Sequence, residues 1–385
     1  IHSILVHMKI VLTGGGTGGH FYPLIAVAEE INKIVDDEKI AHVEMYYFSD
    51  APYDREILFE NRIHFVEIPA GKLRVYFSLK NFTDMFKTAY GVLVGFWNVF
   101  RVYPDVIFAK GAYASFPTLF AAKLLRIPVI IHESDSAPGR VTNWAGKFAQ
   151  YIALSYAESA QFFPKDRVAH VGQPVRPELE HPIKDGAYEF LQLEPTIPTI
   201  FVFGGSLGAQ IINEAILQAL PDLLTKFQII HQTGKNNFEE VSNRSKLILE
   251  GNEFASRYKP FPYLNPLSIR MSAGVANVII TRAGSSLFEI ASWGVPAIVI
   301  PITTTNNDHQ RKNAFGYARA GGGIVIEEKN LTPHIIINEV TRIITDLNLH
   351  NKMAKAAKDF YQPNAAHKIA KKVLEIGLSH LPKEK

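Results

Sequence analysis

Short runs of consecutive apolar residues alternate along the chain with longer segments whose apolar residues recur every three or four positions. After Met8 the sequence reads KIVLTGGGTGGHFYPLIAVAEEINKIV, in which Leu24, Val27 and Ile31 are spaced as on one face of a helix. A short apolar run is typical of a strand buried on both faces, and a 3.6-residue period is typical of an amphipathic helix. The pattern therefore predicts a strand, a glycine-rich turn and a helix, in that order.

The same alternation continues along the chain. Apolar runs at 42–48, 105–109 and 128–132 are each separated by enough residues for a helix, and the pattern resumes through 227–234, 277–301 and 321–326. Strands that alternate with helices form a mostly parallel sheet with helices on both faces. The sequence predicts an α/β protein.

The opening pattern occurs a second time. Residues 199–216 read TIFVFGGSLGAQIINEAI, which again places glycines between a β-branched run and an amphipathic segment. Such a repeat predicts two Rossmann-like, doubly wound domains in tandem. Prolines and a lapse of helical period near 170–182 favour a boundary there, giving domains of 8–173 and 174–362. A Lys- and Ala-rich segment, 363–381, is predicted to be a helix that completes the first domain.

Two segments bear on targeting. Residues 1–7 lack a basic start, a long apolar region and a small-residue cleavage site, so they are excluded from the expected fold and Met8 is taken as the start. The longest uncharged apolar stretch, Thr88 to Phe100, is shorter than the roughly 20 residues of a spanning helix. No membrane span is expected.

The net charge and the absence of cysteine limit the partners and the chemistry that the protein can have. The 385 residues include 40 Lys and Arg and 37 Asp and Glu, a net charge of +3. This balance excludes a protein whose main partner is nucleic acid. The chain has no cysteine, which excludes disulfides, thiolate nucleophiles and thiolate zinc sites and fits a reducing compartment.

The first glycine-rich turn is a candidate binding site. Glycines at 14, 15, 16, 18 and 19 let a ligand approach the backbone, and free N–H groups at a helix start favour an anion such as a diphosphate. His20 follows this turn, where a neutral imidazole could accept the proton of an attacking hydroxyl. A helix-start histidine that only bonds a loop is the alternative. The motif Gly14-x-Gly16-x-x-Gly19, with Asp50 after the next strand, also fits an NAD-dependent oxidoreductase.

The second half offers two similar turns, at 204–209 and 281–286, and a parallel sheet places such turns on one edge. Glu289 could accept hydrogen bonds from ribose hydroxyls, or it could simply favour the helix start. The polar run 306–310, with Asn313, suits recognition of sugar hydroxyls, although a surface loop would use the same residues.

The loop after the run 128–132 reads HESDSAPGR and brings His132, Glu133 and Asp135 together. A metal site is not expected here, because no second ligand cluster and no D-x-D pair occur. We expect neither a metal nor another cofactor, and assign the loop to substrate contact or loop ordering.

Residues 71–87 mix large apolar residues with Lys and Arg. This combination favours contact with an anionic membrane surface, with apolar side chains among the headgroups and cations on lipid phosphates. A loop whose Lys and Arg stems cover the core is the alternative. The candidate membrane contacts are Lys72, Leu73, Arg74, Phe77 and Phe82.

A family resemblance rests on several motifs in order. TGGGTGGHFYP, GAYASFPTLFAA, the HES-D loop with its PG, VGQPVR, FGGSLGAQ, TRAGSSLFEIASWGVPAIVIP and NDHQRKNA span nearly all of the chain after Met8. In this combination the chain resembles the MurG family of peptidoglycan N-acetylglucosaminyltransferases. The resemblance implies a GT-B fold, in which two Rossmann-like domains face across a cleft.

The resemblance also implies a reaction and its partners. GlcNAc would pass from UDP-GlcNAc to the C4 hydroxyl of the muramoyl sugar of lipid I (undecaprenyl-diphosphoryl-MurNAc-pentapeptide), with inversion, giving lipid II at the cytoplasmic face of the cell membrane. The carried-over donor residues are Thr17, Gly18, Gly19, Arg176, Ser206, Gly284, Glu289, His309 and Gln310. Gly15, Gly16 and Thr17 would hold the acceptor diphosphate, with His20 as the base.

Three positions depart from the family pattern. Asp135 stands where many relatives carry Asn, which makes it a second candidate base, and His309 stands where some carry Gln. Pro262 lies near the expected uracil site and has no N–H to offer the base. Another GT-B transferase with a glycolipid acceptor, the oxidoreductase above and a non-catalytic UDP-sugar-binding protein remain as alternatives.

Overall fold

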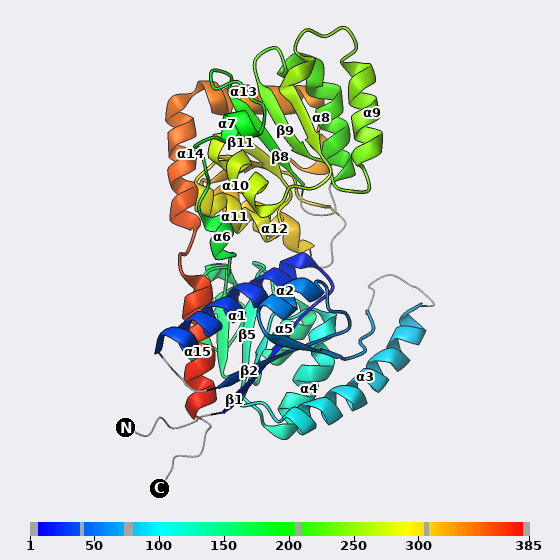
Figure 1. The fold of residues 1–385 in the computed structure, drawn as a ribbon, viewed down its shortest axis with the longest axis vertical. Helices are drawn as coiled ribbons and strands as arrows, with labels where there is room; N and C mark the ends of the chain where they lie inside the picture. The colour runs from blue at the N-terminus through cyan, green and yellow to red at the C-terminus, as the bar shows by residue number, and fades with distance from the viewer. Residues whose placement is uncertain (1–6, 39–41, 73–79, 205–208, 304–307, 380–385) are drawn as a thin grey trace. The chain divides into compact units, whose positions relative to one another are not determined.

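Figure 1 shows the computed structural model, which describes residues 7–38, 42–72, 80–204, 209–303 and 308–379. The chain divides into two compact units. One runs up to Arg176 and resumes at Gln362, and the other is Pro177–Tyr361. Arg176, which the sequence analysis placed in the second domain, belongs to the first unit.

The first unit is built on a parallel sheet. Within the described residues it has seven strands in the order β3-β2-β1-β4-β5-β6-β7. The strands are β1 (Met8–Thr13), β2 (Val43–Ser49), β3 (Ile63–Glu67), β4 (Val106–Ala109), β5 (Val129–Glu133), β6 (Tyr151–Leu154) and β7 (Val168–His170). The order reverses between β1 and β4, the point at which such sheets bind ligands.

Helices cover both faces of this sheet. They are α1 (Gly18–Glu38), α2 (Arg55–Glu60), α3 (Lys80–Val102), α4 (Phe116–Leu125), α5 (Arg140–Ala145) and α15 (Ala365–Ser379). Successive residues of β1 point to opposite faces, so Ile10 and Leu12 join the core with α1 and α15, while Val11 joins the core with α4. Burial on both faces explains why β1 is an unbroken apolar run.

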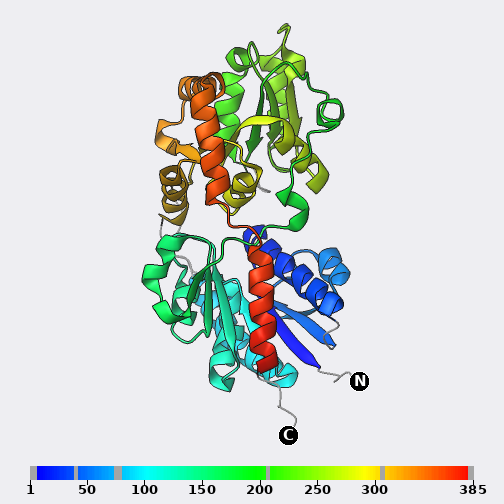
Figure 2. The same cartoon turned by 90° about the vertical axis from the view of Figure 1, so that its left-hand side faces the viewer.

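The C-terminal helix α15 completes the first unit. Figure 2 shows it, in red, along the sheet of this unit. Ile369, Val373 and Leu374 are buried in the core that contains Ile10 of β1. A Cβ placed on Gly377 would lie 2.8 Å from Sδ of Met8, so the helix approaches the start of β1 closely.

The second unit repeats this architecture. Within the described residues its parallel sheet has six strands in the order β10-β9-β8-β11-β12-β13. The strands are β8 (Thr199–Phe203), β9 (Gln228–Gln232), β10 (Tyr258–Phe261), β11 (Ala276–Thr281), β12 (Ala297–Val299) and β13 (Gly323–Val325). The equivalent places of β1 and β8 confirm the predicted pair of Rossmann-like folds.

The helices of the second unit are α6 (Pro177–Glu180), α7 (Ala187–Phe190), α8 (Gln210–Leu223), α9 (Phe238–Ile248), α10 (Pro266–Val275), α11 (Ser286–Trp293), α12 (His309–Ala320), α13 (Pro333–Thr345) and α14 (Leu347–Phe360). Ile216 and Leu220 of α8 pack with Ile336 and Val340 of α13 in one core against the sheet. This face of the sheet has the same role as the α1 and α15 face of the first unit.

Helix α3 packs against the first unit along a narrow line of glycines. A Cβ on Gly91 would lie 1.7 Å from the carbonyl oxygen of Pro69, so only glycine permits this approach. At Gly95 the approach is less close, because a Cβ there would lie 3.2 Å from atoms of Pro117. Among the described residues, no helix, α3 included, combines the length and the apolar character that crossing a membrane requires.

Candidate functional site

The first glycine turn lies at the switch point of the first sheet, directly after β1. A Cβ on Gly15 would lie 2.3 Å from Oγ of Ser49, and Gly16 has a φ of +86°, a left-handed conformation that favours glycine. Tyr113 packs against Gly16, because a Cβ there would lie 3.1 Å from its ring. Close packing and backbone conformation thus account for these two glycines.

His20 lies in the first turn of α1. The backbone N–H groups of His20 and Phe21 donate to the carbonyl of Thr17, each at 3.1 Å. The side chain of Thr17 adds a hydrogen bond between its Oγ1 and Nδ1 of His20, at 2.9 Å. The imidazole is partly exposed and is held at the start of the helix, in contact with Thr17.

Asp50 follows β2 beside this turn. The hydroxyl of Tyr113 donates to Oδ2 of Asp50 at 2.6 Å. Burial of Tyr113 and this hydrogen bond raise the pKa of the tyrosine. The carboxylate that the oxidoreductase alternative would assign to a ribose therefore has a partner within the protein.

The HES-D loop follows β5 and is fastened by Glu133. Its carboxylate accepts the N–H groups of Asp135 at 3.0 Å and Gly139 at 3.1 Å. Oγ of Ser159 donates to the carbonyl of Asp135 at 2.7 Å. Burial raises the pKa of Glu133 to about 7, and the side chain of Asp135 is partly exposed. Glu133 orders the loop, and Asp135 lies on it.

Lys110 follows β4 and is only 2% exposed, and it is not among the residues predicted from the sequence. Its ammonium contacts His132 within β5, Ser134 after β5 and Gln173 after β7. The sequence does contain a signal for this residue, because Lys110 directly follows the apolar run VIFA. A lysine in such a position is buried only where it has partners.

The second unit contributes a rim after β11 and β12. Gly284 follows β11, and a Cβ there would meet nothing within 4 Å. Glu289 lies in the first turn of α11 and is partly exposed. Ser206 lies outside the described residues, while Gly204, at the end of β8, is described.

The start of α12 is tied to that rim. Oε1 of Gln310 accepts the N–H of Ile302 at 3.2 Å, and Nδ2 of the buried Asn313 donates to the carbonyl of Ala283 at 3.3 Å. His309, the first residue of α12, is partly exposed. Gln310 is therefore bonded to the segment after β12, and Asn313 joins α12 to the turn that contains Gly284.

An ion pair that the sequence did not reveal supports the same rim. Arg282 pairs with Glu328 at 2.7 Å, and both side chains are largely buried. Glu328 also accepts from the hydroxyl of Thr303 at 2.7 Å, and Arg282 donates to the carbonyl of Ile300 at 3.0 Å. These bonds fix the segment that follows β12.

Arg176 belongs to the first unit and not to the unit that contains this rim. Its guanidinium stacks over the ring of Tyr22 on α1, 4.4 Å from the centroid. This places Arg176 beside the helix that opens with the first glycine turn, in the first unit.

The predicted membrane segment is described only in part. Lys72 is exposed, and its ammonium lies 5.2 Å from the ring centroid of Tyr113. Leu73, Arg74 and Phe77 lie outside the described residues. Phe82 is 64% exposed, and other apolar residues of α3 are exposed both within the predicted segment and beyond it: Met85, Phe86, Tyr90, Leu93, Phe96, Trp97 and Phe100. We call these residues, with Phe82, the α3 stripe.

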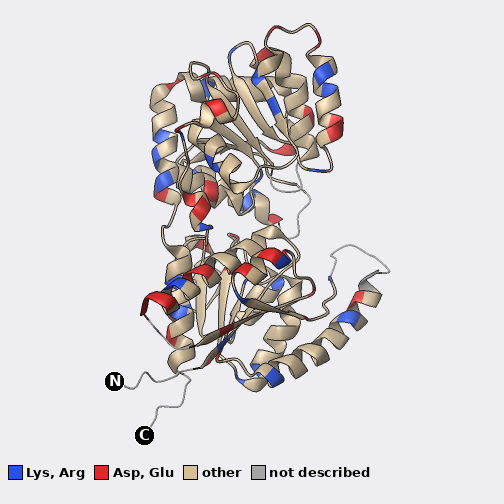
Figure 3. Cartoon of the chain, in the orientation of Figure 1, with Lys and Arg blue, Asp and Glu red and all other residues tan. Residues whose placement is uncertain are grey.

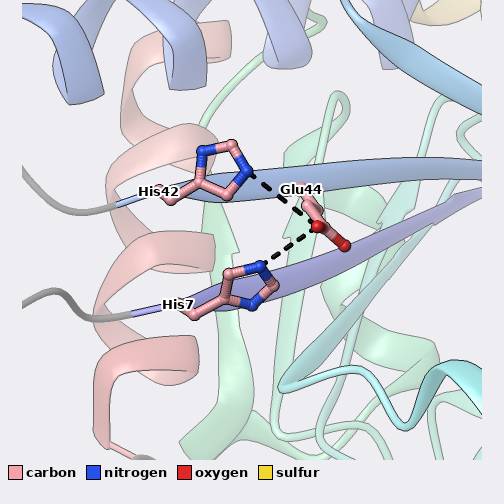
Figure 4. A group of neighbouring side chains, drawn as sticks. All are labelled: His7, His42 and Glu44. Carbon is pink, nitrogen blue, oxygen red and sulfur yellow. Dashed lines mark hydrogen bonds and ion pairs between the residues drawn. The ribbon is translucent and has the colours of Figure 1, made fainter.

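One side-chain group of the described residues has the spacing of metal ligands. Figure 4 shows His7, His42 and Glu44 at the start of β1 and β2, with ligand atoms within 4.8 Å of one another. A hydrogen bond of 3.1 Å between Nε2 of His7 and Oε1 of Glu44 accounts for their approach. The group lies at the amino ends of the strands, at the opposite sheet edge from the glycine turn.

Sequence comparisons identify two domains. Residues 10–154 match the glycosyltransferase family 28 N-terminal domain, and residues 199–373 match the family 28 C-terminal domain. A Treponema denticola protein is 32% identical over 93% of this chain and 93% of its own length. A Bacillus cereus protein is 34% identical over 93% of this chain and 96% of its own. Each is named as a UDP-N-acetylglucosamine–N-acetylmuramyl-(pentapeptide) pyrophosphoryl-undecaprenol N-acetylglucosamine transferase.

Structural comparison supports the fold. The MurG structure from Acinetobacter baumannii has a TM-score of 0.72, with 24% identity over 96% of this chain and 99% of its own. A UDP-GlcNAc 2-epimerase from Neisseria meningitidis has a TM-score of 0.66 and 15% identity over 96% of this chain and 100% of its own. The fold is thus common to transferases and epimerases, and the sequence decides between them. By sequence over nearly its whole length, the chain belongs to glycosyltransferase family 28, among the MurG-type N-acetylglucosamine transferases.

Proposed function

We propose that the protein transfers GlcNAc from UDP-GlcNAc to lipid I, forming lipid II and UDP in peptidoglycan synthesis. The observation that carries this proposal is the identity of 32% and 34% to transferases named for this donor and acceptor, over 93% of the chain. The alternatives of an oxidoreductase and of a different acceptor have no comparable support.

The reaction forms one bond and breaks one. The C4 hydroxyl oxygen of the muramoyl sugar attacks the anomeric carbon of GlcNAc, from the face opposite the diphosphate. The bond between that carbon and the diphosphate oxygen breaks, and UDP leaves with the electron pair. The hydroxyl proton passes to a base on the protein, and the anomeric configuration is inverted.

The first unit is assigned to the acceptor. The backbone N–H groups of Gly15, Gly16 and Thr17 would hold its diphosphate, because these residues form the turn between β1 and α1, where free N–H groups and the helix dipole favour an anion. Residues at this turn, Thr17, Gly18 and Gly19, would also reach the donor.

His20 is assigned as the base. With the ring proton on Nδ1 donated to Oγ1 of Thr17, 2.9 Å away, Nε2 holds the lone pair that accepts the sugar proton. Asp135 is the second candidate, because it lies partly exposed on a loop that Glu133 orders.

The second unit is assigned to the donor. Glu289 would accept hydrogen bonds from the ribose, and His309 and Gln310 would bind GlcNAc hydroxyls. A Cβ on Gly284 would meet nothing within 4 Å among the described residues, which leaves the backbone there accessible to a diphosphate oxygen. The starts of α11 and α12, with Ser206 and Arg176, would stabilise the charge that builds on the departing UDP.

A transfer assay tests the function. Full-length protein is incubated with UDP-GlcNAc and a short-chain lipid I analogue in EDTA, and UDP release and product mass are followed. We expect one UDP for each disaccharide-lipid formed, with activity retained in EDTA. Conversion of the sugar nucleotide without lipid product, or transfer only to another lipid, would refute the proposal.

The base assignment is tested with His20→Ala. Loss of a general base is expected to lower kcat by about 100-fold or more, with UDP-GlcNAc affinity nearly unchanged. His64→Ala, an exposed histidine of β3, is the matched control. If Asp135→Asn abolishes turnover while His20→Ala keeps it, the roles are reversed.

We also place the protein at the cytoplasmic face of the cell membrane, bound peripherally through the α3 stripe. Its residues recur at helical spacing on one helix, and Leu93 is 70% and Trp97 62% exposed. Lys87 and Arg101 are exposed on the same helix, whose only acidic residue is Asp84. Figure 3 shows α3 uncharged over most of its length. Anionic lipid offers both partners that such a helix requires, an apolar layer and phosphates.

A further inference from the structure

We propose that Lys110 is a positioning residue for the acceptor half of the transfer: its buried ammonium fixes the loop that carries Asp135 against the ends of the neighbouring strands. This inference rests on the proposed function. It concerns a residue that neither touches the reacting atoms nor belongs to a motif recognised from the sequence.

The contacts of Lys110 join the carboxyl ends of several strands. Nζ donates to Nδ1 of His132 at 2.5 Å, to Oε1 of Gln173 at 3.2 Å and to Oγ of Ser134. His132 lies in β5, one residue before its end, Ser134 directly follows β5, and Gln173 follows β7. Ser155, after β6, donates to the same Oε1 of Gln173 at 2.9 Å. One ammonium therefore holds the segments after β4, β5 and β7 in register.

The protonation of His132 agrees with this role. Its Nε2 faces the carbonyl of Gly172 at 2.9 Å, so Nε2 carries the hydrogen and Nδ1 presents a lone pair to Lys110. Burial and the charge of Lys110 lower the pKa of His132 well below its usual value, which keeps the ring neutral. An ammonium and a neutral imidazole form a donor and acceptor pair.

The ammonium of Lys110 is buried, and burial disfavours its charged form. Burial lowers the pKa of Lys110 to about 7, while the carboxylates of Glu133 and Asp135 favour its protonated form. The titratable groups that face it are thus His132, Glu133 and Asp135. A buried lysine of this kind is costly for stability unless its hydrogen bonds are made, so its presence indicates a task beyond packing.

That task is the placement of the loop relative to the glycine turn. The N–H of Lys110 donates to the carbonyl of Thr13 at 2.9 Å, and a Cβ on Gly14 would lie 3.1 Å from Cβ of Lys110. Lys110 therefore contacts the turn assigned to the acceptor diphosphate with its backbone and the loop of Asp135 with its side chain. A shift of about 1 Å in such an element can cost roughly 100-fold in rate.

The test compares Lys110→Met with wild type in the transfer assay. Methionine keeps the apolar stem but removes the three donated hydrogen bonds. We expect kcat/KM for lipid I analogue to fall about 10- to 100-fold, KM for UDP-GlcNAc to stay within about twofold, and hydrogen exchange at Asp135 and Gly139 to accelerate. Ser134→Ala removes one of the acceptors of Lys110 and should change the same quantities by a smaller factor. If Lys110→Met does not fold, Ser134→Ala takes its place as the test variant.

Two controls separate positioning from general stability. Leu119→Ala destabilises the same unit from the fully buried core of α4, by roughly 2–5 kcal/mol. Thr118→Val alters a buried hydroxyl without a hydrogen-bond partner among the described residues. The inference is wrong if Leu119→Ala lowers kcat/KM for the lipid I analogue as much as Lys110→Met does. It is also wrong if neither Lys110→Met nor Ser134→Ala changes this kcat/KM. Absence of transfer in wild type would instead refute the proposed function.

Discussion

Buried titratable side chains occur in both units, and burial acts on each so as to disfavour its charged form. His132 and Lys110 lie in the first unit, and His231 on β9 lies in the second, fully buried. Nδ1 of His231 lies 2.8 Å from the hydroxyl of Tyr258, and Nε2 lies 3.0 Å from Oδ1 of Asn213. Apolar runs located these strands in the sequence, but only the folded chain shows which polar residues inside them are paired.

Acid sensitivity of the second unit follows from His231. Burial lowers its pKa to about 3, against roughly 6.5 in an unfolded chain. Between these values the unfolded state binds a proton that the folded state does not, so stability falls as pH drops below about 6.5. At pH 5 the loss amounts to about 2 kcal/mol. Urea unfolding at pH 7 and pH 5, monitored through hydrogen exchange of the β9 amides, measures this loss of stability. His231→Gln should reduce this dependence, and an unchanged slope would contradict the assignment.

At the scale of elements, α3 differs from the other helices of its unit. Its glycine line, with Gly91 against Pro69, faces the unit, while the α3 stripe is exposed. The membrane surface predicted from the sequence, a basic and apolar segment, ended at Lys87. The stripe from Tyr90 to Phe100 was missed, because apolar residues on a helix are ordinarily read as core.

The α3 stripe predicts membrane binding. Leu93→Glu together with Trp97→Glu should weaken binding to vesicles of phosphatidylglycerol and phosphatidylethanolamine by about tenfold or more, since each buried apolar side chain contributes roughly 1.5–3 kcal/mol. Vesicle co-sedimentation measures this. Leu247→Glu, at a 73% exposed leucine of α9, is the matched control. Unchanged binding of the double variant would assign the stripe to a partner other than lipid.

At the scale of the molecule, one chain forms two sheets whose strand orders correspond except for the additional strand β7 of the first, and the last helix returns to that first sheet. Val373 of α15 and Val340 of α13 are each fully buried, one in each unit. The fold is shared with UDP-GlcNAc epimerases, so architecture alone does not determine the reaction. The sequence similarity to MurG-type transferases distinguishes this chain from the epimerases.

Because α15 packs in the core of the first unit, we expect a substitution in the core of one unit to destabilise that unit alone. Val373→Asp places an unpaired carboxylate in the first core and should destabilise that unit by several kcal/mol, about 3–5. Hydrogen exchange should accelerate at amides of β1 and β4 and remain slow at β8 and β11. Val340→Asp should give the opposite pattern. Equal acceleration in both sheets for both variants would show that the units do not have separate cores.

The sequence by itself determined the alternation of strands and helices, the two glycine turns and the order of motifs, because burial on both faces produces continuous apolar runs and tight turns require glycine. It missed β3, β6, β7 and β10, whose burial is partial or whose runs are short. Only tertiary structure decided that Arg176 stacks on Tyr22, that Lys110 joins His132 and Gln173, and that the α3 stripe is exposed. Each of these depends on residues far apart in sequence, and no local pattern specifies such contacts.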